Sequence, residues 1–188
     1  MRAGIALLIF CLSVLCAEGR ELPAYMTTVP APSSLAKTLD MADFCLREPV
    51  VCRAAPAEHI TLDRKLSVLL ATVNVRVNHS IRYVAKDSAQ KNFWTDNPRE
   101  GDCGVYVVTK WAQLQEAGLP AGALSVAITQ VRGFYHAVLV VETDKGDYIL
   151  DNNRQEVVLW SAAPEYTWLF RSRPGQPLVW DFIGSPSS

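Results

Sequence analysis

Residues 101–118 have the sequence GDCGVYVVTKWAQLQEAG, and they form the last helical stretch before the chain changes to strand periodicity. The candidate core positions of this stretch recur at spacings of 4, 4 and 3, typical of one helix face, and they are Cys103, Val107, Trp111 and Leu114. We expect the helix to begin at Asp102 or Cys103. It should end at Gly118, because glycine commonly follows the last turn of a helix.

Two more helices are expected before this stretch. The first begins at a Ser33 or Ser34 cap and runs to about Arg47. The second begins at a Thr61 cap, and its apolar positions recur at helical spacing, namely Leu62, Leu66, Leu69, Leu70, Val73, Val77 and Ile81.

After Gly118 the chain has β-rich runs separated by turn residues. We expect strands at Leu124–Val131, Phe134–Thr143, Asp147–Asp151 and Glu156–Trp160, with one or two more at Tyr166–Arg171 and Leu178–Phe182. Helices followed by an antiparallel sheet predict an α+β fold, in which the N-terminal helices pack on the sheet.

The composition limits the class of protein. The 188 residues carry a net charge of −1, and 49% of them are hydrophobic. This balance excludes a disordered chain, offers no basic excess for nucleic acid and fits one domain. No apolar run approaches the roughly 20 residues that cross a bilayer, so no membrane span is expected.

Residues 1–19 are expected to form a secretory signal peptide. The apolar run Ile5–Leu15 follows a basic residue and precedes the small residues Ala17 and Gly19. A lipoprotein signal at Cys16 is disfavoured because Leu15 stands where a small residue is expected. The mature chain would work in the periplasm or as a secreted protein, with an extended lead-in at 20–33, a domain at 34–183 and a flexible tail at 184–188.

Three cysteines remain outside the signal peptide. Cys45 and Cys52 are seven residues apart and flank Pro49, which can bring them close enough for a disulfide. Cys103 is then the odd cysteine. It is either reactive, paired with another chain, or simply buried and inert.

A catalytic arrangement can be built around Cys103. The N-terminus of a helix favours a thiolate, and a histidine is the usual base for its proton. His136 begins an apolar strand, and Asp151 ends the next one and could orient the imidazole. Taken singly, each residue also has a structural explanation: a packed cysteine, a boundary histidine and a turn aspartate.

The hairpin between His136 and Asp151 tests this arrangement. A two-residue turn at Lys145-Gly146 places Asp151 opposite Val140, roughly 13 Å along the strand from His136. A four-residue loop from Thr143 to Gly146 pairs Glu142 with Asp147 and places Asp151 opposite Val138. His136 and Asp151 are then diagonal neighbours, so the triad requires the second register.

Asn74 and Asn78 lie one helical turn apart. They either hydrogen-bond the loop of the active site or belong to an exposed polar face.

These residues together resemble the bacterial transglutaminase-like cysteine peptidases of the papain-like superfamily. The resemblance covers about Leu35 to Asn152 and is carried by Phe44-Cys45 with Arg47, Pro49 and Cys52, Val73-Asn74 and Val77-Asn78 with Ile81 and Tyr83, Trp94 and Pro98, Gly101-Asp102-Cys103, His136-Ala137-Val138-Leu139 and Leu150-Asp151-Asn152. It implies a papain-like fold and an exported enzyme that hydrolyses a protein or peptide substrate through a thioester. Cys103 would be the nucleophile, His136 the general acid and base, and Asp151 its orienting group. The Cys103 backbone N–H would help to hold the oxyanion.

The chain departs from this family directly after the cysteine. Two acidic residues usually follow it, and calcium-binding members use acidic groups there, whereas this chain has Gly104 and Val105. Calcium takes six to eight oxygen ligands, and only Asp102 remains of the flanking acids. We therefore expect no calcium requirement, no metal site and no other cofactor, with Asp102 acting as the helix cap.

Two other functions fit the same sequence. Another papain-like group also places a cysteine at a helix start, and it cleaves cell-wall peptides. The replaced acids would also fit a non-catalytic binding module on the same fold.

Overall fold

The computed structural model describes residues 23–32, 41–85 and 99–184. The predicted signal peptide, the start of the first helix at Ser33 or Ser34, the approach residues Trp94 and Pro98, and most of the predicted tail lie outside the described residues. Within the described ranges, no helix is long and apolar enough to cross a membrane.

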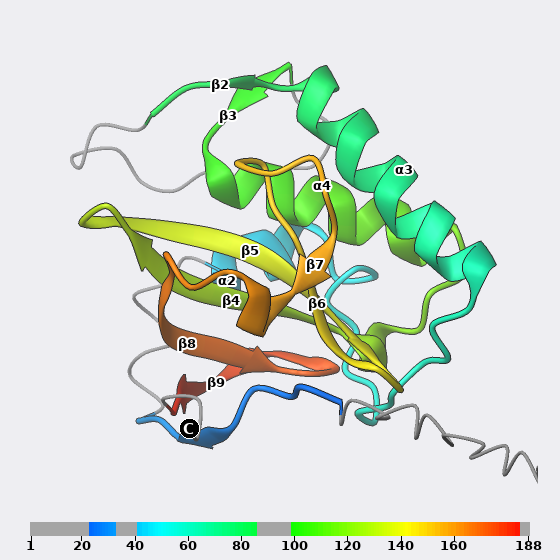
Figure 1. The fold of residues 1–188 in the computed structure, drawn as a ribbon, viewed down its shortest axis with the longest axis vertical. Coiled ribbons are helices and arrows are strands. Elements are labelled where there is room, and N and C mark those ends of the chain that lie inside the picture. The colour runs from blue at the N-terminus through cyan, green and yellow to red at the C-terminus, as the bar shows by residue number, and fades with distance from the viewer. Residues whose placement is uncertain (1–22, 33–40, 86–98, 185–188) are drawn as a thin grey trace, which may run out of the picture.

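An antiparallel sheet forms one layer of the molecule (Figure 1). It has seven strands in the order β1-β9-β8-β4-β5-β6-β7. The strands are β1 Thr28–Pro30, β4 Leu124–Val131, β5 Phe134–Thr143, β6 Gly146–Leu150, β7 Val158–Leu159, β8 Thr167–Arg173 and β9 Gln176–Ile183. The segment predicted as an extended lead-in contributes the edge strand β1, which pairs with β9.

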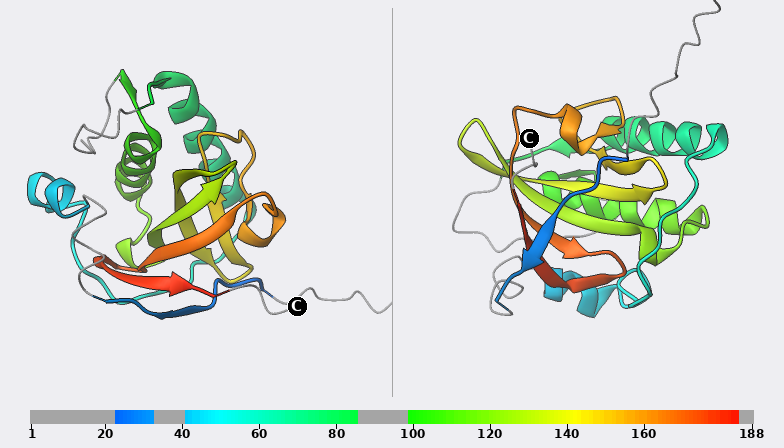
Figure 2. Two further views of the ribbon diagram at one scale, coloured as in Figure 1. Left: turned by 90° about the vertical axis from the view of Figure 1, so that its left-hand side faces the viewer. Right: turned by 60° about the horizontal axis from the view of Figure 1, so that its bottom comes forward.

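Helices α3 and α4 cover one face of this sheet, as the two orientations in Figures 1 and 2 show. The helices are α2 Met41–Arg47, α3 Arg64–Ser80 and α4 Cys103–Glu116, with short 3-10 turns at Ala121–Ala123 and Trp160–Ala162. The prediction of an α+β fold with helices packed on an antiparallel sheet is confirmed.

The ends of α4 are those that the sequence predicts. Asp102 is its N-cap, and its carboxylate accepts a hydrogen bond from the Val105 N–H at 3.3 Å. Beyond the other end, Gly118 has φ +94°, a left-handed conformation that glycine adopts without strain. The predicted Thr61 cap of α3 is wrong. The helix is capped by Asp63, because the Asp63 carboxylate accepts from the Leu66 N–H at 2.7 Å.

Strands β4 and β5 have the predicted bounds, whereas the last predicted strands have shifted ends. The run at Glu156–Trp160 contains only Val158–Leu159 as a strand, because Trp160 begins a 3-10 turn. Strand β6 begins and ends one residue earlier than predicted, β8 begins one residue later and ends two residues later, and β9 is longer at both ends. A disulfide joins Cys45 in α2 to Cys52, which confirms the predicted pair.

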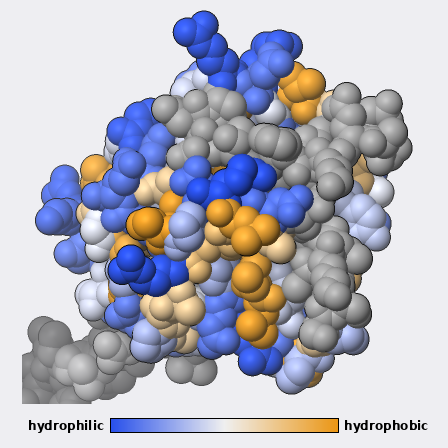
Figure 3. Space-filling model, turned by 180° about the vertical axis from the view of Figure 1, so that it is seen from behind, coloured by the Kyte–Doolittle hydropathy of each residue, from blue (hydrophilic) through white to orange (hydrophobic). Residues whose placement is uncertain are grey.

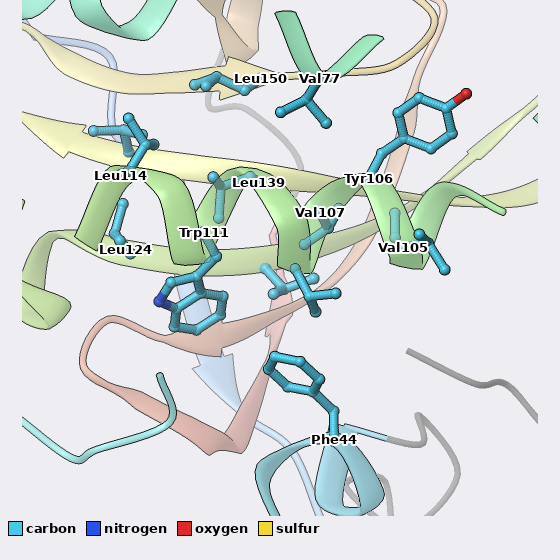
Figure 4. Packing of buried hydrophobic residues seen from close by; sticks show 14 of the residues in the cluster. Phe44, Val77, Val105, Tyr106, Val107, Trp111, Leu114, Leu124, Leu139 and Leu150 are labelled. Atoms are coloured by element: carbon cyan, nitrogen blue, oxygen red, sulfur yellow. The ribbon is translucent and has the colours of Figure 1, made fainter. Parts of the chain in front are cut away.

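The main hydrophobic core lies between the helices and the sheet. Residues at alternate positions of β5, such as Leu139 and Val141, join this core, while Val138 and Val140 pack on the opposite face of the sheet. Figure 4 shows α4 running along the strand behind it, with Trp111 directed toward the Phe44 side. On the face seen from behind in Figure 3, hydrophobic residues lie in groups between hydrophilic ones. The rigid unit of α4 and β5 is therefore what positions Cys103 and His136.

Candidate active site

Cys103 is the first residue of α4. The chain reaches it directly after a short strand that belongs to a parallel pair. Strand β3, Glu100–Gly101, pairs with β2, Arg82–Tyr83. A Cβ at Gly101 would lie 2.6 Å from the Val105 side chain, so only glycine lets the chain turn this closely onto the helix. Cys103 forms no disulfide and is partly exposed, so its sulfur is accessible at the start of α4.

The β5–β6 hairpin has the register that the triad requires. Glu142 pairs with Asp147 and Leu139 with Leu150, which places Asp151 opposite Val138. The loop itself differs from the prediction. Thr143 also pairs with Gly146, so the connection is a two-residue turn at Asp144 and Lys145. Position 146 requires glycine for two reasons. Its φ is +117°, which other residues rarely adopt, and a side chain there would collide with the Ala24 backbone.

His136 and Asp151 meet as predicted. His136 Nε2 lies 2.7 Å from Asp151 Oδ1, and both side chains are buried. The Cys103 thiol lies close enough to the same imidazole to act on its pKa. Because Nε2 faces Asp151, Nδ1 is the ring nitrogen left for the thiol. The structure thus brings all three predicted site residues together around one ring.

The Asp151 carboxylate has three hydrogen-bond donors. Oδ1 accepts from His136 and from the Asn153 backbone N–H at 2.9 Å, and Oδ2 accepts from the Tyr166 hydroxyl. Burial opposes charge on this group, but the hydrogen bond and charge of His136 and these further donors outweigh it and hold the pKa of Asp151 below its ordinary value. Asp151 is therefore a fixed carboxylate at neutral pH.

The imidazole is held in its charged form by these partners. Burial by itself lowers the pKa of His136, but the hydrogen bond to Asp151, the interaction with the Cys103 side chain and the negative charge of Asp151 raise it to about 9. Tyr166 also lies edge-on to the ring, with centroids 5.9 Å apart. A histidine held beside a cysteine by a carboxylate is the arrangement that a nucleophilic cysteine requires.

The loop after Asp151 is fastened to α3 by the two asparagines. Asn78 Nδ2 donates to the Asp151 and Arg154 carbonyls, each at 2.8 Å, and Asn74 Nδ2 donates to the Arg154 and Gln155 carbonyls, each at 2.9 Å. Of the two alternatives for these residues, hydrogen bonding to the site loop is confirmed.

Two residues of the site were not predicted from the sequence. Tyr166 supplies the second oxygen of Asp151 with a donor, and the Asn153 amide lies 3.2 Å from His136 Nε2. No periodicity or motif marks either of them. Asn153 follows Asp151 closely in the sequence, whereas Tyr166 lies just before β8 and packs with Val138 and Val140 on the face of the sheet away from the main core.

A pocket of about 780 Å³ opens beside His136. Its walls come from the β4–β5 hairpin, β2 and the segment around Tyr166, and the lining residues include Tyr83, Arg132, Phe134, Tyr135, Arg154 and Glu165. Phe134 and Tyr135 are 76% and 71% exposed, so large apolar surface is free next to the imidazole. A pocket of this size and character suits a polypeptide segment.

The residues around Cys103 do not fit a calcium ion. Gly104 and Val105 are buried, and Val105 packs against the Gly101 backbone, so no carboxylate follows the cysteine. The Asp102 carboxylate is engaged as the cap of α4. Among residues 23–32, 41–85 and 99–184, no group of three His, Cys, Asp or Glu side chains is placed to hold a metal.

Comparison with known proteins gives a family and a fold. The family described as bacterial transglutaminase-like cysteine proteinase matches residues 33–188. A calcium-bound structure of Legionella pneumophila LapG is similar, with a TM-score of 0.51 and 17% sequence identity over 75% of this chain and 83% of that chain. A second structure of Legionella pneumophila LapG has a TM-score of 0.50 and 19% identity over 74% of this chain and 78% of that chain. No curated protein matches the sequence.

Proposed function

The chain belongs to the bacterial transglutaminase-like cysteine proteinases, and from this premise we propose that it is an exported peptidase that uses Cys103, His136 and Asp151 as its catalytic triad. The observation that carries the proposal is the single imidazole that bonds to the Asp151 carboxylate at 2.7 Å and interacts with the Cys103 thiol at the start of α4. The enzyme class, a cysteine peptidase, follows from the family.

In the first half of the reaction, the Cys103 thiolate attacks the carbonyl carbon of a peptide bond. The His136 imidazolium then gives its proton to the leaving amine, the C–N bond breaks, and a thioester on Cys103 remains. The Cys103 backbone N–H lies at the start of α4 and donates to the oxyanion. Asp151 stays ionised throughout and stabilises the imidazolium.

In the second half, the neutral imidazole accepts a proton from water while the water oxygen attacks the thioester carbonyl. The C–S bond breaks, the carboxylic acid product leaves, and the thiolate–imidazolium pair is restored. Every proton that moves in this cycle passes through His136, which explains why its ring is fixed by partners on both sides.

The pocket beside His136 is the part of the site that takes the amine half of the substrate. It is lined by His136 but not by Cys103, and the general acid must lie next to the leaving nitrogen. We assign the exposed rings of Phe134 and Tyr135 to contacts with the polypeptide on this side. The substrate is then a protein or peptide, which agrees with the family.

Export is proposed from the N-terminal sequence and the disulfide. The apolar run Ile5–Leu15 has the length of a signal peptide, and the Cys45–Cys52 bond persists in an oxidising compartment. The periplasm or the outside of the cell meets both conditions.

The experiment uses the full mature chain and a library of peptides derived from a bacterial proteome, with cleavage sites mapped by mass spectrometry. We expect defined cleavages with the native chain and none with Cys103→Ala, whose circular dichroism should be unchanged. Cleavage retained in Cys103→Ala would overturn the proposal. If the chain releases fragments from purified peptidoglycan but cleaves no peptide of the library, the cell-wall function would be favoured. If the Cys103 thiol does not react with iodoacetamide at neutral pH and no substrate is cleaved, a non-catalytic binding module would be favoured.

A further inference from the structure

The turn between β4 and β5 holds an arginine in a backbone conformation that this residue type rarely adopts. Val131 pairs with Phe134, so the turn consists of Arg132 and Gly133, with φ of 52° and 83°. A two-residue turn with positive φ at both positions favours the sequence Asn-Gly. Among the non-glycine residues that the structure describes, Arg132 alone has positive φ. Asparagine would suit the turn better, so local folding gives no reason for an arginine here.

This turn stands at the pocket beside His136. Arg132 is exposed and lines the pocket together with Phe134, Tyr135 and His136. Figure 1 shows the turn at the end of the β4–β5 hairpin, projecting past β6 and β8. Four residues along an extended strand span roughly 13 Å, which is the largest separation that the strand allows between the backbones of Arg132 and His136. Arg132 therefore lines the part of the pocket away from the imidazole.

The other charged groups of this pocket are paired. Arg154 forms an ion pair with Glu165, and His136 bonds to Asp151. Arg132 has no ion-pair partner within the part of the chain that the structure describes. An arginine stays protonated at every pH at which the protein is folded. Although the whole chain has a net charge of −1, this pocket therefore carries the unbalanced positive charge of Arg132.

We propose that Arg132 is a specificity-determining residue of the peptidase and binds a carboxylate of the substrate on the amine side of the cleaved bond. This inference rests on the proposed function, because it uses the assignment of the pocket to the amine half of the substrate. A guanidinium presents two parallel N–H donors that match the two oxygens of a carboxylate. The carboxylate belongs either to an aspartate or glutamate side chain or to the C-terminus of a short substrate.

The geometry also gives the place of an acidic side chain in the substrate. The leaving nitrogen lies next to His136, and an extended peptide advances about 3.3 Å per residue. Because the arginine side chain can reach back along the hairpin, the acidic residue should stand roughly two to four residues after the cleaved bond. The exposed rings of Phe134 and Tyr135 come between Arg132 and His136 along β5 and contact the residues before it.

The first test maps the cleavage sites in the proteome-derived peptides with the full mature chain and its variants. We expect aspartate and glutamate to be enriched at these positions with the native chain and with the control Arg53→Asn, an exposed arginine outside the pocket. The enrichment should disappear with Arg132→Asn, and lysine and arginine should replace the acids with Arg132→Asp. The thermal midpoint of Arg132→Asn should be unchanged or higher, because asparagine suits the turn.

The second test uses one cleaved peptide and needs no protein variant. Replacing its acidic residue by the corresponding amide should lower kcat/KM of the native chain roughly threefold to fivefold, mainly through KM, as expected for one exposed ion pair. With Arg132→Asn, the same replacement should have no effect. Amidation of the peptide C-terminus separates the two sources: if this change lowers kcat/KM instead, Arg132 binds the C-terminal carboxylate.

Native cleavage that shows neither an acidic preference nor an effect of amidation would overturn the inference and leave the proposed function intact. An acidic preference that persists in Arg132→Asn would overturn it as well. If the native chain cleaves no peptide, the proposed function fails separately. Binding of short alanine-rich peptides with either glutamate or glutamine to Cys103→Ala, measured by fluorescence anisotropy, then decides the role of Arg132. Equal affinities would refute it, whereas tighter binding of the glutamate peptide that is lost on adding Arg132→Asn would support it.

Discussion

His136 Nε2 lies 2.7 Å from Asp151 Oδ1, although 15 residues separate them along the chain. The β5–β6 hairpin makes this contact, because its register puts the two residues on diagonal positions of neighbouring strands. The contact fixes the tautomer and the charge of the imidazole, so its removal should affect chemistry more than folding.

Asp151→Asn should lower kcat/KM by about a hundredfold or more, since an amide cannot stabilise the imidazolium by charge. The pKa of His136 should fall in this variant, because the Asp151 hydrogen bond is a main cause of its rise. Peptide cleavage and the pH profile of kcat/KM measure both effects. Tyr166→Phe, which removes only the donor to Oδ2, should have a smaller effect, and equal losses in the two variants would contradict the assigned roles.

The raised pKa of His136 gives a stability that depends on pH. A group whose pKa is higher in the folded state than in the unfolded chain stabilises the fold fully below its unfolded pKa, and this contribution is lost as the pH rises through the folded value. For His136 that window runs from the ordinary value of 6.5 to about 9. The difference in melting temperature between the native chain and His136→Gln should therefore shrink across this window. His79→Gln, at the exposed end of α3, is the control, and a difference that stays constant for His136→Gln would refute the expectation.

Arg171→Met should destabilise the fold by about 3–5 kcal/mol, because it leaves buried carboxylates without a cation. The guanidinium donates to Asp147 at 2.8 Å and to Glu142, and all three side chains are buried. Arg173→Met is the matched control: its partner Asp181 is bound at 2.8 Å, but the arginine is exposed to solvent, so the loss of stability should be much smaller. Urea unfolding measures both. The penalty of Arg171→Met should decrease at pH 5, because burial raises the pKa of Glu142 to about 7.

Asn78→Ala should loosen the loop after Asp151 and lower kcat more than it raises KM. The variant loses hydrogen bonds to the Asp151 and Arg154 carbonyls, with a cost of about 1–3 kcal/mol when the buried carbonyls stay unpaired. Asn74→Ala breaks two similar bonds farther from Asp151 and should cost comparable stability with less activity. Kinetics and urea unfolding of the two variants separate these effects, and equal activity losses would argue against a special role for Asn78.

Chelation of divalent cations should leave activity unchanged. The positions after Cys103 hold Gly104 and Val105, which are buried and offer no carboxylate. Peptide cleavage should be the same in EGTA and in millimolar calcium, and the melting temperature should not move. If activity disappears in EGTA and returns with calcium, the prediction is wrong, and the chain holds a calcium site that does not depend on the two positions after Cys103.

The order and the ends of the central elements were determined by local sequence. Cys103 heads a helix because Asp102 can cap it and the apolar positions behind it repeat at helical spacing. Strands β4 and β5 have their predicted ends because alternating apolar residues are bounded by turn residues at Arg132 and Gly133. These signals lie within a few residues of the feature that they predict.

The tertiary structure alone decided the hairpin register and the donors to Asp151. The sequence left two connections between β5 and β6 open, and the observed turn at Asp144 and Lys145 is neither of them, because Thr143 also pairs with Gly146. Tyr166 becomes a partner of Asp151 only through the path of the chain into β8. Such contacts join residues far apart along the chain, and no local propensity encodes them, because they arise only when separate layers pack.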